Sequence, residues 1–356
     1  MVTTPRLRAL LLMAALCSAA CRPSIEGRAS LVDRDVVLAI QSVPAETGPG
    51  KPVQYNVLYA GIDGAADAKA LDWALCSARK PLAASGSVAL ACFEPSGAAL
   101  SALGTGATVK GQLAKDACQL FGPTPPPPEK GQPNGRPADA DTTGGYFQPV
   151  RLLERVQGEQ DAYAFGMTRL LCGVLAAQDQ AAEFGQRYRP NENPVLDTVV
   201  LRRGADTEPL TDQADKGQAV RVKPGETVTF RASWAPCPRQ SRCGDGICGP
   251  REDLTNCAAD CQTTPKGCTG SEWYAYFDPA HRVVVDRRES IRVSWYANDG
   301  EFAHDRTGTA EAQGATMSTD NAWTAPPSTG QALIWVVIRD DRGGVSWKSY
   351  KLDVAR

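Results

Sequence analysis

The residues best suited to chemistry lie between positions 243 and 261, which read CGDGICGPREDLTNCAADC. The four cysteines in this run could bind a metal ion, exchange disulfides or cross-link the chain. Five acidic or amide side chains among them could supply hard oxygen ligands to calcium: Asp245, Glu252, Asp253, Asn256 and Asp260. The choice among these chemistries depends on the compartment, because an oxidising environment joins thiols in disulfides.

The N-terminus has the pattern of an export signal. Arg6 and Arg8 precede an apolar run from Ala9 to Leu16, and small residues follow. The run is too short to span a bilayer, which takes about 20 apolar residues. We therefore expect residues 1–20 to be a signal peptide.

The small residues end in Ser18-Ala19-Ala20-Cys21, which resembles the lipobox of bacterial lipoproteins. The resemblance implies that Cys21 is lipidated and becomes the N-terminus of the mature chain, with residues 21–34 as a tether. Two or more acyl chains give lasting membrane attachment. Arg22 follows the cysteine where Asp would signal inner-membrane retention, so the resemblance favours the outer membrane. The alternative is ordinary cleavage after Ala20, which leaves Cys21 as a free thiol.

Ten cysteines follow Cys21, four in the first half of the chain and six in the second. In an exported protein an even number of cysteines indicates disulfides. Four cysteines allow three pairings and six allow fifteen, so the sequence assigns no partners. The candidates are Cys76, Cys92, Cys118, Cys172, Cys237, Cys243, Cys248, Cys257, Cys261 and Cys268.

Residues 237–268 are expected to form a small insertion held by disulfides. The segment has almost no hydrophobic side chains beyond Ile247 and Leu254, and chains this short need cross-links or a metal. Zinc and redox catalysis are disfavoured because the segment lacks a C-x₂-C pair. Calcium stays an alternative, although the spacing of the acidic residues does not follow the EF-hand pattern.

Two stretches of the same pattern predict two domains of one architecture. PGKPVQYNVLYAG (49–61) and PGETVTFRASWA (224–235) each begin with a Pro-Gly turn and continue with alternating apolar and polar residues, as half-buried strands do. A tryptophan-centred strand follows each of them. We therefore expect Trp73 and Trp273 to fill the cores of the two domains.

The C-terminal stretch predicts strands over 290–302 and 321–327 and a hairpin over 331–354 that turns at 340–344. The order W…G-x-F…WTAP…VVIRDDRGG…LDV in these stretches resembles bacterial immunoglobulin-like and polycystic-kidney-disease-type repeats of surface proteins. That resemblance implies a β-sandwich.

We therefore expect an all-β fold of two immunoglobulin-like β-sandwich domains. The first domain covers 35–189 and includes an exposed Pro-rich loop at 121–145, and the second covers 190–356 with the disulfide-rich insertion 237–268. Alanines and a phenylalanine over 176–184 indicate a short helix that closes the first domain.

The insertion itself resembles the C-G-D-G-x-C…N-C-x-x-D-C module of exported proteins in myxobacteria and their relatives. The whole chain is similar to uncharacterised surface lipoproteins of those bacteria. The resemblance implies a location at the cell surface and names no activity.

Composition and motifs favour a non-enzymatic role. The net charge of −2 argues against a nucleic-acid partner bound by bulk charge. The two histidines are His281 and His304, the chain has no H-E-x-x-H or G-x-S-x-G motif, and the His304-Asp305 pair is weak evidence for a triad.

We expect a structural or adhesive protein anchored in the membrane, whose partner is another envelope protein or a glycan. The first alternative is a carbohydrate- or calcium-dependent binding module, in which Trp323, Tyr274 and Tyr276 would stack on sugars. A hydrolase is the least supported alternative, since nothing singles out a catalytic residue.

Overall fold

The computed structural model describes residues 29–80, 87–123, 145–155, 161–215, 219–239, 242–249, 252–262, 267–313 and 316–356. The expected signal peptide, Cys21 and most of the Pro-rich loop lie outside these residues. No helix in the described part of the chain is long and apolar enough to cross a membrane.

The first sandwich consists of two sheets. In one sheet β3 is central, with β1 on one side and β4 and β7 on the other: β1 (Val36–Val43), β3 (Pro52–Gly61), β4 (Gly64–Ala65) and β7 (Thr108–Gln112). The second sheet has the order β2-β9-β8-β5-β6: β2 (Glu46–Thr47), β9 (Ala162–Leu170), β8 (Tyr146–Glu154), β5 (Asp72–Cys76) and β6 (Leu100–Thr105). Alternate residues of β3 point into the core between the sheets, as expected from the period of two.

The second sandwich also has two sheets. One has the order β11-β10-β13-β19-β17: β11 (Asp206–Pro209), β10 (Leu196–Arg203), β13 (Thr227–Trp234), β19 (Ser318–Thr324) and β17 (Glu301–Phe302). The other has the order β12-β21-β20-β16-β18: β12 (Val220–Val222), β21 (Val345–Val354), β20 (Gly330–Asp340), β16 (Ile291–Ala297) and β18 (Arg306–Thr309). The predicted turn at 340–344 joins β20 to β21.

The two sandwiches share one strand topology, which confirms two domains of the same architecture. Eight strands of the first sandwich correspond one by one, in chain order, to eight strands of the second, and each corresponding pair of strands has corresponding neighbours in its sheet. The first set is β1, β2, β3, β5, β6, β7, β8 and β9, and the second is β10, β12, β13, β16, β18, β19, β20 and β21. In each sandwich a short strand pairs in parallel with the last strand, and the other pairs are antiparallel. The arrangement is immunoglobulin-like, and the predicted all-β sandwich fold is therefore confirmed.

A buried tryptophan occupies the same place in each core. Trp73 on β5 lies 6.1 Å from the ring of Tyr55 on β3, and Trp295 on β16 lies 6.2 Å from the ring of Phe230 on β13. Both tryptophans are fully buried. The prediction for Trp73 is confirmed, and the one for Trp273 is wrong.

The prediction for Trp273 fails because an extra hairpin lies between the insertion and the core strand β16, which carries Trp295. The hairpin pairs β14 (Trp273–Asp278) with β15 (Val283–Arg288), and both lie between β13 and β16 in the chain. Trp273 is only partly buried, and the guanidinium of Arg239 lies 4.9 Å from its ring.

The predicted short helix exists but packs against an unexpected partner. Helix α3 (Gln178–Arg187) places Phe184 in a cluster with Ala275 and Phe277 of β14. Our expectation that the helix closes the first domain is therefore wrong, because its one buried side chain covers the hairpin. Within the described ranges, the other helical elements are short: η1 (Ala68–Ala70), η2 (Leu90–Phe93), α2 (Ala117–Phe121), η3 (Gln213–Asp215) and η4 (Glu311–Gln313).

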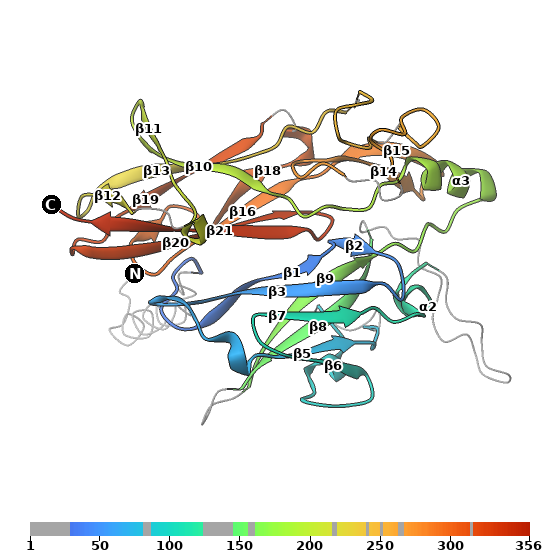
Figure 1. Ribbon diagram of the computed structural model, residues 1–356, viewed down its shortest axis with the longest axis horizontal. Coiled ribbons are helices and arrows are strands. Elements are labelled where there is room, and N and C mark those ends of the chain that lie inside the picture. Colours follow the sequence, from blue (N-terminus) through green and yellow to red (C-terminus); the bar gives the residue numbers. More distant parts are fainter. Residues whose placement is uncertain are drawn as a thin grey trace, which may run out of the picture.

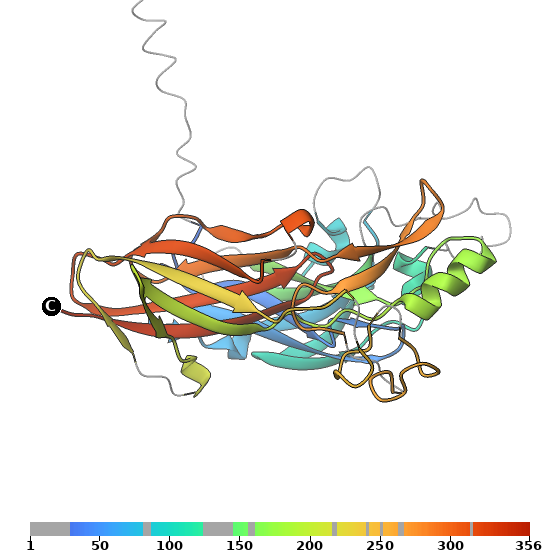
Figure 2. The same ribbon diagram turned by 90° about the horizontal axis from the view of Figure 1, so that it is seen from above.

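The two sandwiches lie side by side, with β1 and β3 of the first facing β20 and β21 of the second (Figure 1). Seen from above, α3 and the β14–β15 hairpin lie at the end of the molecule opposite the C-terminus (Figure 2). Five disulfides join all ten expected cysteines in the pairs Cys76–Cys92, Cys118–Cys172, Cys237–Cys268, Cys243–Cys257 and Cys248–Cys261.

Candidate functional site at the domain junction

The faces that the two sandwiches turn towards each other are apolar. On β20, Leu333, Trp335 and Val337 point away from the core of their own sandwich and are buried. They meet Leu38 of β1 and Leu58 of β3, which point out of the first sandwich. An outer sheet face is usually polar when it is solvated. These side chains therefore make the contact between the sandwiches part of the folded core.

A cluster of buried charges lies at one end of this contact. We call it the ion cluster and define it as Glu46, Arg169, Tyr188, Glu272, Glu289, Asp340 and Arg342. Its centre is Arg342, in the β20–β21 turn, which is 1% exposed. Burial of a guanidinium is costly unless carboxylates and hydrogen bonds compensate its charge.

Arg342 contacts both sandwiches through its two terminal nitrogens. Nη2 lies 3.3 Å from Oε2 of Glu46, on β2 of the first sandwich, and donates to the carbonyl oxygen of Arg189 at 2.7 Å. Nη1 lies 3.2 Å from Oε2 of Glu272 and 3.2 Å from Oε1 of Glu289, at the base of the β14–β15 hairpin. One guanidinium thus joins three buried carboxylates from separate parts of the chain.

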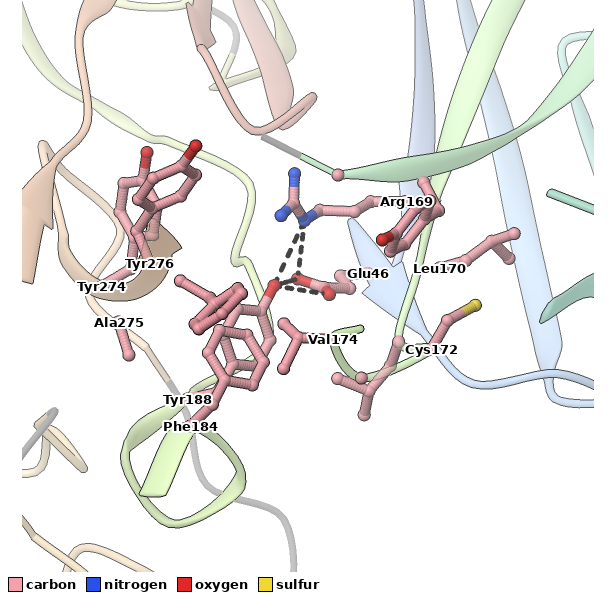
Figure 3. Close-up of a pocket in the computed structure, with 15 residues that line it drawn as sticks. Glu46, Arg169, Leu170, Cys172, Val174, Phe184, Tyr188, Tyr274, Ala275 and Tyr276 are labelled. Atoms are coloured by element: carbon pink, nitrogen blue, oxygen red, sulfur yellow. Dashed lines mark hydrogen bonds and ion pairs between the residues drawn. The ribbon is translucent and has the colours of Figure 1, made fainter. Parts of the chain in front are cut away.

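Three further groups hold the carboxylate of Glu46, and two of them, Arg169 and Tyr188, are drawn in Figure 3. Its carboxylate lies 3.3 Å from Nε of Arg169 on β9 and accepts the hydroxyl proton of Tyr188 at 2.6 Å. It also accepts the backbone N–H of Asn191 at 2.8 Å. Glu46 therefore ties the strand β2 to the connector between the two sandwiches, which covers residues 171–195 between β9 and β10.

The turn that carries Arg342 is fixed by Asp340. Oδ1 of this carboxylate accepts the backbone N–H of Arg342 at 2.9 Å and that of Gly344 at 2.7 Å. Asn191 donates to the other oxygen at 3.1 Å. Gly343 has φ +98, a conformation that favours glycine, and a Cβ there would lie 3.0 Å from the ring of Phe147. The turn sequence therefore determines where the guanidinium points.

Burial shifts the protonation of the cluster. It raises the pKa of Glu272 to about 7, and it raises the pKa of Glu289 well above its usual value, with the charge of Asp340 as the second cause. Burial also raises the pKa of Asp340. For Arg342, burial alone acts to lower the pKa, but Tyr188 and the surrounding carboxylates raise it well above its usual value. The guanidinium stays charged, and the carboxyl groups compete for it.

The space beside the ion cluster is too small for a ligand. A cavity of about 30 Å³ lies between Glu46, Arg169, Tyr188 and the β14 residues Tyr274 to Phe277 (Figure 3). Such a volume holds one or two water molecules, whereas small-molecule sites measure roughly 300–1,000 Å³. The geometry suits a fixed junction, not a substrate pocket.

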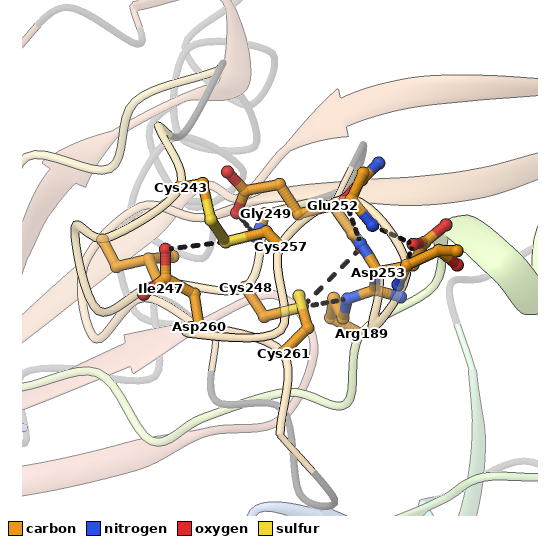
Figure 4. The surroundings of a disulfide bond; sticks show 12 residues. Arg189, Cys243, Ile247, Cys248, Gly249, Glu252, Asp253, Cys257, Asp260 and Cys261 are labelled. Carbon is orange, nitrogen blue, oxygen red and sulfur yellow. Dashed lines mark hydrogen bonds between the residues drawn. A yellow bond between two sulfur atoms is a disulfide. The ribbon is translucent and has the colours of Figure 1, made fainter.

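The insertion 237–268, which we call the disulfide module, sits next to the cluster. Its base is closed by Cys237–Cys268. Arg189, in the connector, is 6% exposed and donates from Nε to Sγ of Cys248 at 3.0 Å (Figure 4). Oε1 of Glu272 accepts the backbone N–H of Cys268 at 3.2 Å. The same glutamate therefore contacts the module and the ion cluster.

The structure does not bring the five proposed calcium ligands together. Oxygens of Asp260 accept the backbone N–H groups of Gly244, Asp245 and Gly246, at 2.5, 3.2 and 3.0 Å. Oxygens of the other four accept backbone N–H groups within three residues in the chain: Asp245 from Ile247, Glu252 from Gly249, Asp253 from Thr255 and Asn256 from Asp253. Each therefore caps a local turn.

Among the described residues, one group of side chains has metal-ligand atoms that converge, namely Cys243, Cys257 and Asp260. The two cysteines are joined to each other, so their sulfurs are not free thiolates. Calcium binding by the module stays a prediction.

Two of the three aromatic residues proposed for sugar stacking are buried, and the carbohydrate hypothesis is wrong for Trp323 and Tyr274. Trp323 is fully buried edge-on to Phe230, and Tyr274 is 4% exposed with the guanidinium of Arg342 4.7 Å from its ring. Tyr276 is half-buried, and Arg287 lies 5.0 Å from its ring. Side chains alternate in direction along β14 and β19, and these rings lie on the faces that pack against other side chains.

The two histidines lie in exposed loops away from the cluster. His281 pairs through Nδ1 with Asp278 at 2.6 Å, within its own turn. The backbone of His304 is held by Asn321, which accepts its N–H at 3.2 Å and donates to its carbonyl oxygen at 2.7 Å. Within the described residues, the contacts of His281 therefore belong to its own turn, and those of His304 are backbone contacts with Asn321 of β19.

Comparisons with known proteins add little to these observations. No protein-family model and no curated protein matches the chain. The D0-D1 domain of intimin matches at 8% identity with a TM-score of 0.19, covering 89% of this chain and 99% of that one.

An alpha-2-macroglobulin of Escherichia coli also matches, in two forms. The form activated by porcine elastase shares 10% identity with a TM-score of 0.19, covering 91% of this chain and 22% of that one. The native form shares 10% identity with a TM-score of 0.20, covering 90% and 17%. Identities and TM-scores this low carry no inference about function.

Proposed function

We propose that the protein is a non-enzymatic structural or adhesive lipoprotein, anchored in the outer membrane through Cys21. The observation that carries the proposal is the junction of the two sandwiches. Its apolar face and its ion cluster join them into one body, and the disulfide module is attached to that body beside Arg189. Such a body suits the task of holding a binding surface at a fixed distance from an anchor.

The placement of the chain's first described residues supports this role. Leu31 bridges to Ala297 on β16, and Ala297 pairs with Ile334 near the start of β20. Arg342 follows the far end of β20. Eight residues of strand span roughly 26 Å, so Leu31 lies about that far along the sandwich from the ion cluster and the disulfide module. A membrane anchor at Cys21 would therefore leave the module pointing away from the membrane.

The test is incorporation of radiolabelled palmitate in a Gram-negative host. We expect label in the wild-type chain and none in Cys21→Ser, which should appear as a chain released from the membrane fraction. Cys17→Ser is the matched control, because it removes the neighbouring cysteine and should leave labelling unchanged. Labelling that persists in Cys21→Ser would contradict the anchor.

The adhesive part of the proposal needs a binding readout. Leu254 is 60% exposed in the disulfide module, at the end that we propose to face outward. We expect Leu254→Asp to weaken binding of intact cells to envelope or glycan-coated surfaces. Ile62→Asp, 53% exposed and on the other sandwich, is the control. Equal binding by the two variants and the wild type would contradict a role for the module.

A further inference from the structure

The ion cluster holds more negative than positive charge. Arg342 forms ion pairs with three carboxylates, and Arg169 forms an ion pair with one of them, Glu46. Glu272 and Glu289 share the single nitrogen Nη1 of Arg342. If all three carboxyl groups were ionised, two cations would face three anions before Asp340 is counted.

An uncompensated buried carboxylate is costly, and such a group usually takes up a proton instead. Glu46 has its own cation in Arg169 and donors in Tyr188 and Asn191. The proton therefore belongs to the remaining pair. Both carboxyl groups of this pair lie 3.2 Å from Nη1 of Arg342, which places them beside each other. Oε2 of Glu289 also accepts the backbone N–H of Glu272 at 3.0 Å.

The charged and titratable groups that face this pair come from every element packed around it. They are Glu46 and Arg169 of the first sandwich, Tyr188, Arg189 and Glu192 of the connector, Tyr274 and Arg287 of the hairpin, and Asp340, Asp341 and Arg342 of the β20–β21 turn. Arg287 already pairs with Glu311 at 2.6 Å, and Arg189 lies against Cys248. Among the described residues, Arg342 is the cation that forms ion pairs with Glu272 and Glu289.

We propose that the domain junction is a proton-linked clamp, in which the packed state holds one proton on the Glu272–Glu289 pair and loses stability when that proton leaves. When both carboxyl groups are charged, they repel each other and compete for Nη1 of Arg342. This competition weakens the contacts of Arg342 with the base of the β14–β15 hairpin. It also weakens the contact of Nη2 with Glu46. The clamp goes beyond the proposed surface role and does not depend on it.

The direction of the pH effect follows from the raised pKa values of both glutamates in the folded chain. Between the usual pKa of 4.5 and about 7, the folded state holds a proton that the unfolded state has released. The folded state is then stabilised at the acidic end of this window and loses that stability as the pH rises. One linked proton changes the unfolding equilibrium constant about tenfold per pH unit.

The test is urea unfolding of the disulfide-intact mature chain, followed by tryptophan fluorescence at intervals from pH 5 to pH 8. We expect the wild-type unfolding constant to rise towards tenfold per pH unit between about pH 5 and pH 7. Glu289→Gln mimics the protonated acid, so it should flatten this dependence and be at least as stable as the wild type at pH 8. Asp320→Asn, at the exposed ion pair with Arg231, should keep the wild-type slope.

The proposal would be overturned if the unfolding constant of the wild type did not change with pH. It would also be overturned if Glu289→Gln and Glu272→Gln both kept the pH dependence of the wild type. A slope lost only in Asp340→Asn would also overturn it, because the proton would then lie in the turn. Should neither glutamine variant fold, infrared spectroscopy of the wild type decides. The carbonyl band of a buried protonated carboxyl group should be present at pH 6 and disappear by pH 8, and its absence at pH 6 would overturn the clamp.

Discussion

Arg342 of the second sandwich donates to Glu46 of the first at 3.3 Å, although 296 positions separate them in the chain. The contact requires the β20–β21 turn, the parallel strand β2 and the connector near Tyr188 to be in place together. It therefore reports on the relative position of the two sandwiches more directly than any contact within one of them.

Replacing Arg342 by methionine should be strongly destabilising. The variant leaves the three buried carboxyl groups with one guanidinium, that of Arg169, and removal of one partner from a buried ion pair costs about 3–5 kcal/mol. We expect Arg342→Met to lose this amount in urea unfolding at pH 7. The loss should shrink towards pH 5, where protonation relieves the carboxylates.

The matched control for this substitution is Arg231→Met. Arg231 pairs with Asp320 at 2.7 Å, but both side chains are 40% exposed. Exposed pairs contribute about 0.2–1 kcal/mol, so we expect a small change. Equal losses in the two variants would show that the ion cluster has no special role in stability.

The two core tryptophans should be equivalent in energy. Both are fully buried at matching places, and truncation of such a side chain costs about 3–5 kcal/mol. We expect Trp73→Ala and Trp295→Ala each to lose this amount, and Trp273→Ala to lose clearly less, because its ring is partly exposed. A larger loss at Trp273 in the same urea titration would contradict the assignment of the core strand.

The disulfide that closes the base of the module should control its local order. Replacing Cys237 and Cys268 together by serine should leave the sandwiches folded and make residues 237–268 sensitive to trypsin, since the segment has no apolar core. Limited digestion with mass spectrometry measures the cleavage sites. The double variant of Cys76 and Cys92 is the control, and cleavage in the module there as well would contradict a local effect.

The carboxylates of the module should act as turn caps. Binding a cation would require Asp260 to release three backbone N–H groups. We expect no saturable heat on titration of the mature chain with calcium up to millimolar concentration, and we expect Asp260→Asn to loosen the module whether or not calcium is present. A saturable heat that Asp260→Asn abolishes would instead support the calcium hypothesis.

The repeated architecture was predictable because its signals are local. A Pro-Gly turn precedes Tyr55 and Phe230 by the same number of residues, and the alternation that follows marks β3 and β13 in both sandwiches. The turn at 340–344 and the disulfide state of the ten cysteines could be predicted for the same reason. Turn chemistry and cysteine count do not depend on distant contacts.

The core tryptophan of the second sandwich was missed because an insertion separates it from its partner strand. Trp73 follows Tyr55 by 18 positions, whereas Trp295 follows Phe230 by 65. No local sequence pattern identified the residues of the ion cluster. An arginine in a glycine-rich turn resembles a solvated residue, and Glu46, Glu272 and Glu289 lie far apart in the chain. The one available hint was that residues 332–338 are too uniformly apolar for a strand with a solvated face.

Scanning calorimetry of the purified mature chain at pH 6 tests the central claim, that the junction makes the two sandwiches one folded unit. We predict a single transition whose calorimetric and van't Hoff enthalpies agree, and we predict that Arg342→Met divides it into two. Two resolved transitions in the wild-type protein would contradict the claim, because the sandwiches would then unfold independently.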